Sequence, residues 1–325
     1  MTVRLIQAST GGDDAVVEGH DGLTHLTCAF VNNMPDGAFD ATERQFLGLL
    51  EQGSGPSGID VRRYTMPGVP RGEQTSARIA EQYFPFSDIY LEPPDILIVT
   101  GSNPIEEHIQ DEEYWEDLAE LLLWSQERVD SVLLSCLAAH AALTVYDGID
   151  RVRLPTKCTG VFSQHVDASA RLTKGLDPEI VLPHSRWNTV PREGLERSGY
   201  DVIVHSETTG WAVAVREEDG RQLVLVQGHP EYDPSSLLRE YRRDAGRYVH
   251  HERDDLPFLP YHCVSPDDWE LLEQTHHEII DGARKPLLVD RYPFEEVGDR
   301  APWSWRTTAE RLYANWLTSV VDGKD

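Results

Sequence analysis

The chain has 325 residues, of which 40% are hydrophobic and 26% charged, so it is long enough to bury a substantial globular core. Its 56 acidic and 29 basic residues give a formal charge of −27, and such a surface repels nucleic acids and anionic membranes. No run of eighteen apolar residues predicts a membrane span and no secretory signal is recognisable, so a cytoplasmic protein is expected.

The first half of the chain alternates between predicted strands and helices, after a polar leader (residues 1–22) that is expected to be flexible. Apolar runs predict buried strands over residues 23–31, 59–64, 96–100 and 132–134. A capping box at Asp40 and Glu43 predicts the first helix, and further helices are expected over residues 75–83, 111–128 and 137–145. This alternation predicts a mostly parallel sheet between two layers of helices, with ligands bound at the carboxyl ends of the strands.

Strands predominate in the second half, where they are predicted over residues 159–166, 201–205, 211–215 and 223–226. Asp233 and Pro234 have the character of an N-cap and first helical residue, and they predict a helix that ends near Arg247. Residues 250–300 are rich in charge, His and Pro and contain one predicted helix, 266–280; we interpret them as an insertion packed on the core. A last amphipathic helix is expected over residues 303–321, so residues 1–325 are expected to form a single domain.

The four cysteines, Cys28, Cys136, Cys158 and Cys263, are far apart and form no C-x-x-C pair, which predicts free thiols and no metal site. Cys136 stands out because it follows an apolar strand and precedes a helix of small residues. This is the layout of a nucleophile elbow, which exposes the side chain and points a helix N-terminus at the sulfur. An unperturbed thiol is ionised only to a few per cent at neutral pH, so a base is needed. Taken alone, Cys136 is as compatible with a buried structural thiol as with a nucleophile.

A second element, Gly228-His229-Pro230-Glu231, ends a predicted strand. In extended backbone, residues two apart point to the same side, so Glu231 is placed to orient the imidazole of His229. His229 would then accept the proton of the thiol, in the manner of a nucleophile–base–acid triad. A loop histidine beside a surface glutamate is the alternative interpretation of this segment alone.

A cysteine elbow followed roughly 90 residues later by a strand-terminal His-Pro-Glu resembles the class I glutamine amidotransferases. Further motifs narrow the resemblance to the homoserine O-acyltransferases of methionine biosynthesis, the succinyl- and acetyltransferase family. They are NNMPDGAFDATERQFLGLL (32–50), IVTGSNP (98–104), YWEDL (114–118), LLSCLAAHAAL (133–143), LPHSRW (182–187), GHPEYD (228–233) and RLYANWL (311–317). The resemblance covers most of the chain outside residues 260–297, and it implies a flavodoxin-like three-layer α/β/α fold.

The resemblance implies catalytic roles for Cys136 as the carrier of an acyl-thioester, His229 as the proton acceptor and Glu231 as its support. It implies that Lys157, Ser185 and Arg243 contact the substrate, the two cations suiting an α-carboxylate. The co-substrate would be acetyl-CoA or succinyl-CoA, with no permanently bound cofactor or metal. Main-chain N–H groups at Gly101 and Leu137 are expected to stabilise the oxyanion.

The chain also departs from the family pattern. Met34-Pro35-Asp36-Gly37 stands where the family has M-P-K-K, so two lysines near the site are absent. At the position associated with acyl preference, glycine or glutamate in the family, this chain has Ile105, which favours a small acyl group such as acetyl over succinyl.

The expected reaction is therefore ping-pong acyl transfer from acyl-CoA to the hydroxyl of homoserine, or of serine or a related amino alcohol. A glutamine amidotransferase or amidase on the same triad stays open as a hypothesis, although the glycines usual two residues to either side of the cysteine are replaced by Leu134 and Ala138. A non-catalytic binding protein is the second rival hypothesis. A homodimer is expected because the family commonly forms dimers. Small-molecule substrates are the expected partners, not nucleic acid or membrane.

Overall fold

The computed structural model describes residues 3–7, 25–54, 58–282 and 284–323. In these residues ten strands form one sheet in the order β1-β3-β2-β4-β5-β10-β9-β8-β6-β7. Their bounds are β1 Val3–Leu5, β2 His25–Val31, β3 Gly58–Tyr64, β4 Ile96–Val99, β5 Ser131–Ser135, β6 Val152–Val166, β7 Glu179–Thr189, β8 Asp201–Ser206, β9 Gly210–Glu218 and β10 Arg221–Val226. The first six strands in this order, which end with β10, are parallel to their neighbours. From β10 onward, through β9, β8, β6 and β7, each strand pairs antiparallel with the next.

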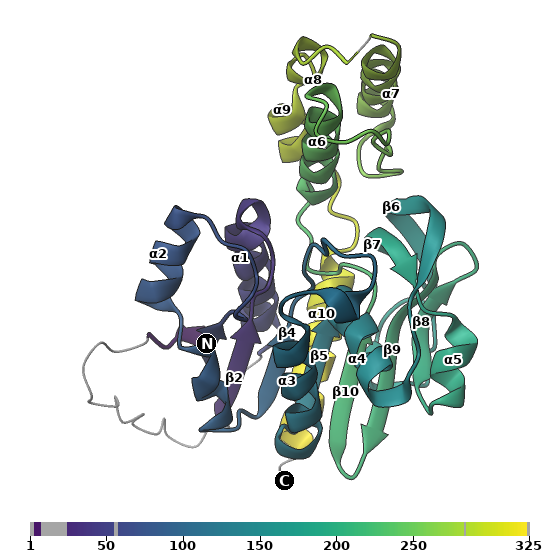
Figure 1. Ribbon diagram of the computed structural model, residues 1–325. Helices are drawn as coiled ribbons and strands as arrows, with labels where there is room; N and C mark the ends of the chain where they lie inside the picture. Colours follow the sequence, from purple (N-terminus) through teal and green to yellow (C-terminus); the bar gives the residue numbers. More distant parts are fainter. Residues whose placement is uncertain (1–2, 8–24, 55–57, 283, 324–325) are drawn as a thin grey trace.

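Helices cover both faces of the parallel half (Figure 1). The α-helices are α1 Asp36–Gly53, α2 Glu73–Gln82, α3 Trp115–Arg128, α4 Leu137–Asp147, α5 Arg192–Arg197, α6 Ser236–Val249, α7 Pro266–Asp281, α8 Leu287–Asp290, α9 Phe294–Arg300 and α10 Arg306–Asp322. Short 3-10 helices are η1 Phe86–Tyr90, η2 Ile109–Asp111 and η3 Arg171–Thr173.

The layering follows from the two-residue period of a strand. In β4, Ile96 and Ile98 face a core shared with α1, α6 and α10, while Leu97 and Val99 face a second core shared with α3 and α4. All four residues are buried, as expected of a central parallel strand covered on both sides. The predicted three-layer α/β/α fold with a mostly parallel sheet is confirmed.

Several element predictions were wrong in detail. The N-terminal leader is not wholly irregular, because Val3–Leu5 forms a parallel strand beside β3; its residues 8–22 lie outside the described part of the chain. Strand β7 was not predicted, because proline and polar residues interrupt its apolar pattern. Such residues are tolerated in β7 because it is an edge strand that pairs only with β6.

The predicted capping box at Asp40 and Glu43 does not exist. Helix α1 already begins at Asp36, and Glu43 is buried, where its carboxylate pairs with Arg63 at 3.1 Å and with Arg78 at 2.7 Å. The predicted N-cap at Asp233 is also wrong, since α6 begins at Ser236.

Residues 250–300 contain α7, predicted closely, and the unpredicted α8 and α9. These helices pack with α6 into a group that stands beyond one end of the sheet (Figure 1). The segment leading into the group lies along β6, where the N–H of Val161 donates to the carbonyl of Tyr261 at 2.8 Å and the N–H of Tyr261 to that of Thr159 at 3.2 Å. The buried side chains of α7, α8 and α9 belong to the same hydrophobic core as those of α1, α6 and α10.

Gly160 allows this close approach. It has a φ of +142°, and a Cβ added there would lie 2.5–3.0 Å from main-chain atoms of Tyr261. We expect Gly160→Ala to lower the free energy of unfolding by roughly 3 kcal/mol or more, because backbone has to move. Gly175→Ala is the control, since Gly175 also has positive φ (+76°) but nothing within 4 Å. It should cost only about 1 kcal/mol. Urea unfolding followed by circular dichroism measures both, and equal losses would contradict a special role of the Tyr261 contact.

Candidate active site

One cavity, at the carboxyl ends of β4, β5 and β10, brings together eight of the nine site residues expected from the sequence. They are Gly101, Cys136, Leu137, Lys157, Ser185, His229, Glu231 and Arg243. They come from five strands or strand ends, from the first residue of α4 and from α6, and they are separated by up to 142 residues in the chain.

Cys136 occupies the sharp turn between β5 and α4. Its φ of +49° and ψ of −105° are uncommon for a residue with a side chain. The turn is held by the N–H of Cys136, which donates to the carbonyl of Val226 at 2.7 Å, and by its carbonyl, which accepts from His140 at 3.2 Å. A strained conformation of this kind, fixed by its surroundings, is typical of a functional residue.

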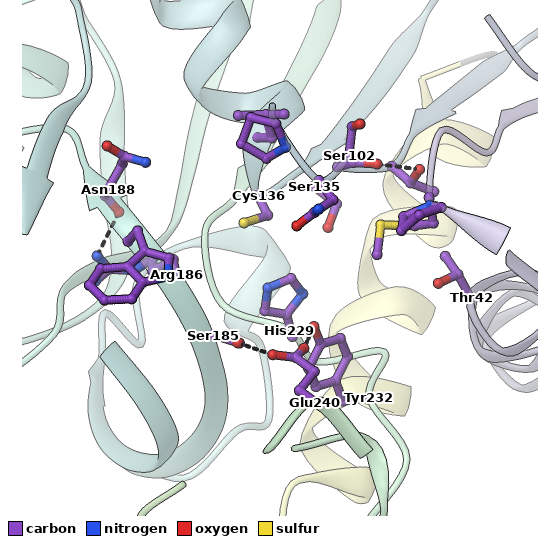
Figure 2. Close-up of a pocket in the computed structure, with 18 of the residues that line it drawn as sticks. Thr42, Ser102, Ser135, Cys136, Ser185, Arg186, Asn188, His229, Tyr232 and Glu240 are labelled. Atoms are coloured by element: carbon purple, nitrogen blue, oxygen red, sulfur yellow. Dashed lines mark hydrogen bonds between the residues drawn. The ribbon is translucent and has the colours of Figure 1, made fainter. Parts of the chain in front are cut away.

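His229 lies three residues after the end of β10, below Cys136 in the view of Figure 2. Its Nδ1 is 2.8 Å from Oε1 of Glu231, and both side chains are buried. The second ring nitrogen, Nε2, has no hydrogen-bond partner in the described part of the chain and is therefore available for proton transfer. Burial disfavours the charged ring, but the nearby Glu231 and Cys136 outweigh it and raise the pKa of His229 well above its usual value.

Tyr232 supports the histidine from its other side. Its ring stacks on that of His229, with centroids 4.2 Å apart and planes 19° from parallel. Its hydroxyl donates to Glu240 at 2.6 Å, so Glu240 fixes the tyrosine that fixes the imidazole (Figure 2). Sequence reasoning missed both residues. Tyr232 stands within the GHPEYD motif, whereas nothing in the sequence singles out Glu240.

Glu240 and Asp244, one helical turn apart on α6, pair with the expected substrate-binding residues. Glu240 accepts a hydrogen bond from Ser185 and lies 3.3 Å from Nζ of Lys157. Asp244 lies 3.2 Å from the same Nζ and 3.0 Å from Arg243. Burial alone would raise the pKa of Glu240, but Lys157 and the hydrogen bond from Ser185 hold it below its usual value. The cavity therefore presents both signs of charge to a ligand.

Gly101 lies against the nucleophile turn. A Cβ at this position would come 3.4 Å from the N–H nitrogen of Leu137 and 3.6 Å from Cβ of Cys136. Glycine keeps this space open beside the sulfur, at the N-terminus of α4, which is where an oxyanion would form.

Ile105 is the expected site residue that the structure does not bring to this cavity. Its side chain is 73% exposed, and it borders an adjoining surface hollow. The N–H groups of Ile105 and Glu106 both donate to Oε1 of Glu112, at 2.7 and 2.8 Å, which holds the loop in this position. Ser102, Asn103 and Pro104 line the cavity instead.

The cavity is basic although the protein is strongly acidic. Six cationic side chains line it, against three carboxylates, those of Glu231, Glu240 and Asp244. The cations are Arg151, Lys157, Arg186, Arg243, Arg247 and Arg253. Arg253 belongs to the 250–300 segment, which therefore contributes to the cavity. Of the four arginines that sequence reasoning missed, only Arg186 stood in a quoted motif, LPHSRW.

Within the described residues, no helix is both long and apolar enough to cross a bilayer, and no group of three or more His, Cys, Asp or Glu side chains is arranged to hold a metal ion.

Comparison with known proteins places the chain in a family. The model of the homoserine O-succinyltransferase family matches residues 17–324. The chain belongs to this family. A homoserine O-succinyltransferase of Rhodopseudomonas palustris is 39% identical over 296 residues, which cover 91% of this chain and 88% of that protein. One of Cardiobacterium hominis is 38% identical over 299 residues, covering 92% and 83%.

Membership of the homoserine O-succinyltransferase family confirms the predictions of an enzyme and of an acyltransferase. Among solved structures, a glutamine amidotransferase from Thermotoga maritima has a TM-score of 0.45 and 12% identity, with 91% of this chain and 99% of that chain covered.

Proposed function

We propose that this chain transfers an acyl group from an acyl-CoA to the hydroxyl of homoserine, through a thioester on Cys136. The observation that carries the proposal is the arrangement of Cys136 on a strained turn above a buried His229, whose far nitrogen is held by Glu231. The family supports the substrates, because its curated members at 38–39% identity are named homoserine O-succinyltransferases.

The first half-reaction uses the triad. His229 takes the thiol proton, and the sulfur of Cys136 attacks the thioester carbonyl of the acyl-CoA. Main-chain N–H groups of Leu137 and Gly101 would stabilise the oxyanion, a contribution of about 3 kcal/mol per donor in comparable sites. The bond from the carbonyl carbon to the CoA sulfur then breaks, and the imidazolium returns its proton to the leaving thiolate.

The second half-reaction needs an amino acid held with its hydroxyl at His229. Homoserine carries a carboxylate and an ammonium group, and the cavity offers Lys157 and Arg243 for the first and Glu240 and Asp244 for the second. These side chains pair with one another, and a zwitterionic acceptor supplies the same two charges in exchange. His229 then removes the hydroxyl proton, the oxygen attacks the thioester, and Cys136 leaves as the thiol.

Succinyl-CoA is the donor that we propose. The relatives are named as succinyltransferases. Ile105 was the reason to expect a small acyl group, but its side chain borders an adjoining hollow and does not line the cavity of Cys136. The homodimer and the single domain over residues 1–325 remain predictions.

The test has two readouts. Intact mass after mixing with succinyl-CoA, without acceptor, should show one added succinyl group, which peptide mapping locates to Cys136. Release of CoA in steady state should then require homoserine. Serine and other amino alcohols serve as rival acceptors, and glutamine as the substrate of a rival amidase. Absence of an adduct from succinyl-, acetyl- and propionyl-CoA alike, or turnover of glutamine, would refute the proposal.

A further inference from the structure

Two of the arginines that line the cavity, Arg151 and Arg186, hold a buried nitrogen and have no acidic partner among the described residues. Arg186, on β7, is 94% buried, since its relative exposure is 6%. Its Nη1 donates to the carbonyl of Asn188 at 3.0 Å (Figure 2). Its Nη2 donates to the carbonyl of Thr209, and its buried Nε has no hydrogen-bond partner among the described residues. Arg151, after α4, repeats the pattern. Its Nη2 donates to the carbonyl of Glu107 at 3.0 Å, and its buried Nη1 has no hydrogen-bond partner in the part of the chain that the structure describes.

The other cations of the cavity are accommodated differently. Lys157 is paired with Glu240 and Asp244, and Arg243 and Arg253 are paired with Asp244. Arg247 is exposed to solvent. The carboxylates of the cavity wall are thus occupied by cations other than Arg151 and Arg186.

Two further carboxylates, those of Glu112 and Asp150, have other hydrogen-bond partners. Glu112, whose charge acts on Arg151, accepts from two main-chain N–H groups. Asp150, its neighbour in the chain, accepts from Gln110 at 3.1 Å. Arg153 adds repulsion, and its guanidinium stacks over Trp187.

A buried cationic nitrogen without a counter-ion is costly. The buried Arg186 and the half-buried Arg151 each hold such a nitrogen in the cavity of the nucleophile, which requires a functional explanation. Arg151, Arg186 and Cys136 line the same cavity. Burial lowers the pKa of both arginines. A ligand group that brings one negative charge close to the acylated sulfur would compensate them.

We propose that Arg151 and Arg186 form a subsite for the distal carboxylate of a dicarboxylic acyl group carried on Cys136. The inference rests on the proposed function and deepens it, because it assigns the residues that distinguish a succinyl from an acetyl donor. Guanidinium groups suit this task, since they bind carboxylates through paired, directed N–H groups.

The experiment measures acylation of Cys136 by intact mass over time, without acceptor, for succinyl-CoA and for acetyl-CoA. Arg186→Gln should slow succinylation at least roughly tenfold while changing acetylation less than about threefold, because only the succinyl group loses a charged hydrogen bond. Arg151→Gln should act in the same direction, and Arg186→Lys should keep part of the preference. Arg243→Gln is the matched control, a paired arginine of the same cavity, and should leave the ratio of the two rates unchanged.

Far-ultraviolet circular dichroism and the melting temperature establish that each variant is folded. If Arg186→Gln does not fold, Arg151→Gln and Arg186→Lys test the carboxylate subsite instead, by the ratio of the succinylation rate to the acetylation rate of Cys136. Equal slowing with both donors, an effect confined to the KM of homoserine, or a wild type that is acylated by acetyl-CoA alone would overturn the carboxylate subsite and leave thioester catalysis standing. Absence of any adduct with either donor would overturn both.

Discussion

Replacing Cys136 by alanine should abolish acyl transfer, with a loss of at least about 10³-fold in kcat, because the thioester cannot form and the two half-reactions lose their common intermediate. The measurement is CoA release with homoserine present, together with intact mass after mixing with acyl-CoA. The variant should bind acyl-CoA without gaining its acyl mass.

Cys158→Ser is the control for this prediction. Cys158 is a half-buried thiol on β6, paired in register with Arg186, and it belongs to no proposed catalytic group. It should retain activity within about threefold, because serine keeps the size and shape of the side chain and Cys158 carries no acyl group in the proposed mechanism. If the acyl adduct persists in Cys136→Ala and disappears in Cys158→Ser, the nucleophile is Cys158 and the proposed assignment to Cys136 is wrong.

Glu231→Gln should lower kcat by roughly 10² to 10⁴, since an amide no longer stabilises the imidazolium and favours the wrong tautomer of the ring. The pH dependence should change as well. In the acyl-enzyme the sulfur carries no charge, so Glu231 remains as the carboxylate that raises the pKa of His229. His229 must be neutral to deprotonate the acceptor, so the rate falls as pH drops through this pKa. Removal of the carboxylate lowers the pKa, and the acid limb should move to lower pH.

A pH profile of kcat under saturating donor, with deacylation limiting, measures this shift. Asp233→Asn is the matched control, because Asp233 lies two residues further along the same loop and pairs with Arg239 and Arg44 instead of His229. Its acid limb should coincide with that of the wild type. If the acid limb of the pH profile does not move in Glu231→Gln, Glu231 does not determine the pKa of His229.

The sequence predicted the parallel half of the sheet well because its strands are buried on both faces and read as unbroken apolar runs, as in β4. It failed at β7, where an edge position tolerates proline and polar residues. It also misjudged Glu43, whose spacing from Asp40 imitates a cap although its carboxylate is buried among arginines.

For the site, local sequence indicated Cys136 and the His229–Glu231 pair because strand ends and short spacing determine their geometry. Glu240, Arg151 and Arg253 could not be found in this way. Glu240 lies on α6, whereas Arg151 and Arg253 lie in loops, and in each case the local sequence shows only a polar residue. The cavity forms only when α6, β7 and the 250–300 segment meet. Ile105 shows the converse limit, since proximity in sequence to Gly101 did not bring its side chain into the cavity.

The contrast between the acidic protein and its basic cavity has a consequence for the rate of substrate capture. With a net charge of −27, the protein as a whole repels the phosphates of an approaching acyl-CoA, and the attraction of the six cavity cations acts only at short range. Salt screens the long-range repulsion first, with a Debye length that falls from about 10 Å at 0.1 M to about 3 Å at 1 M. Added salt should therefore speed the encounter with acyl-CoA, the reverse of the usual behaviour of enzymes that attract an anionic substrate.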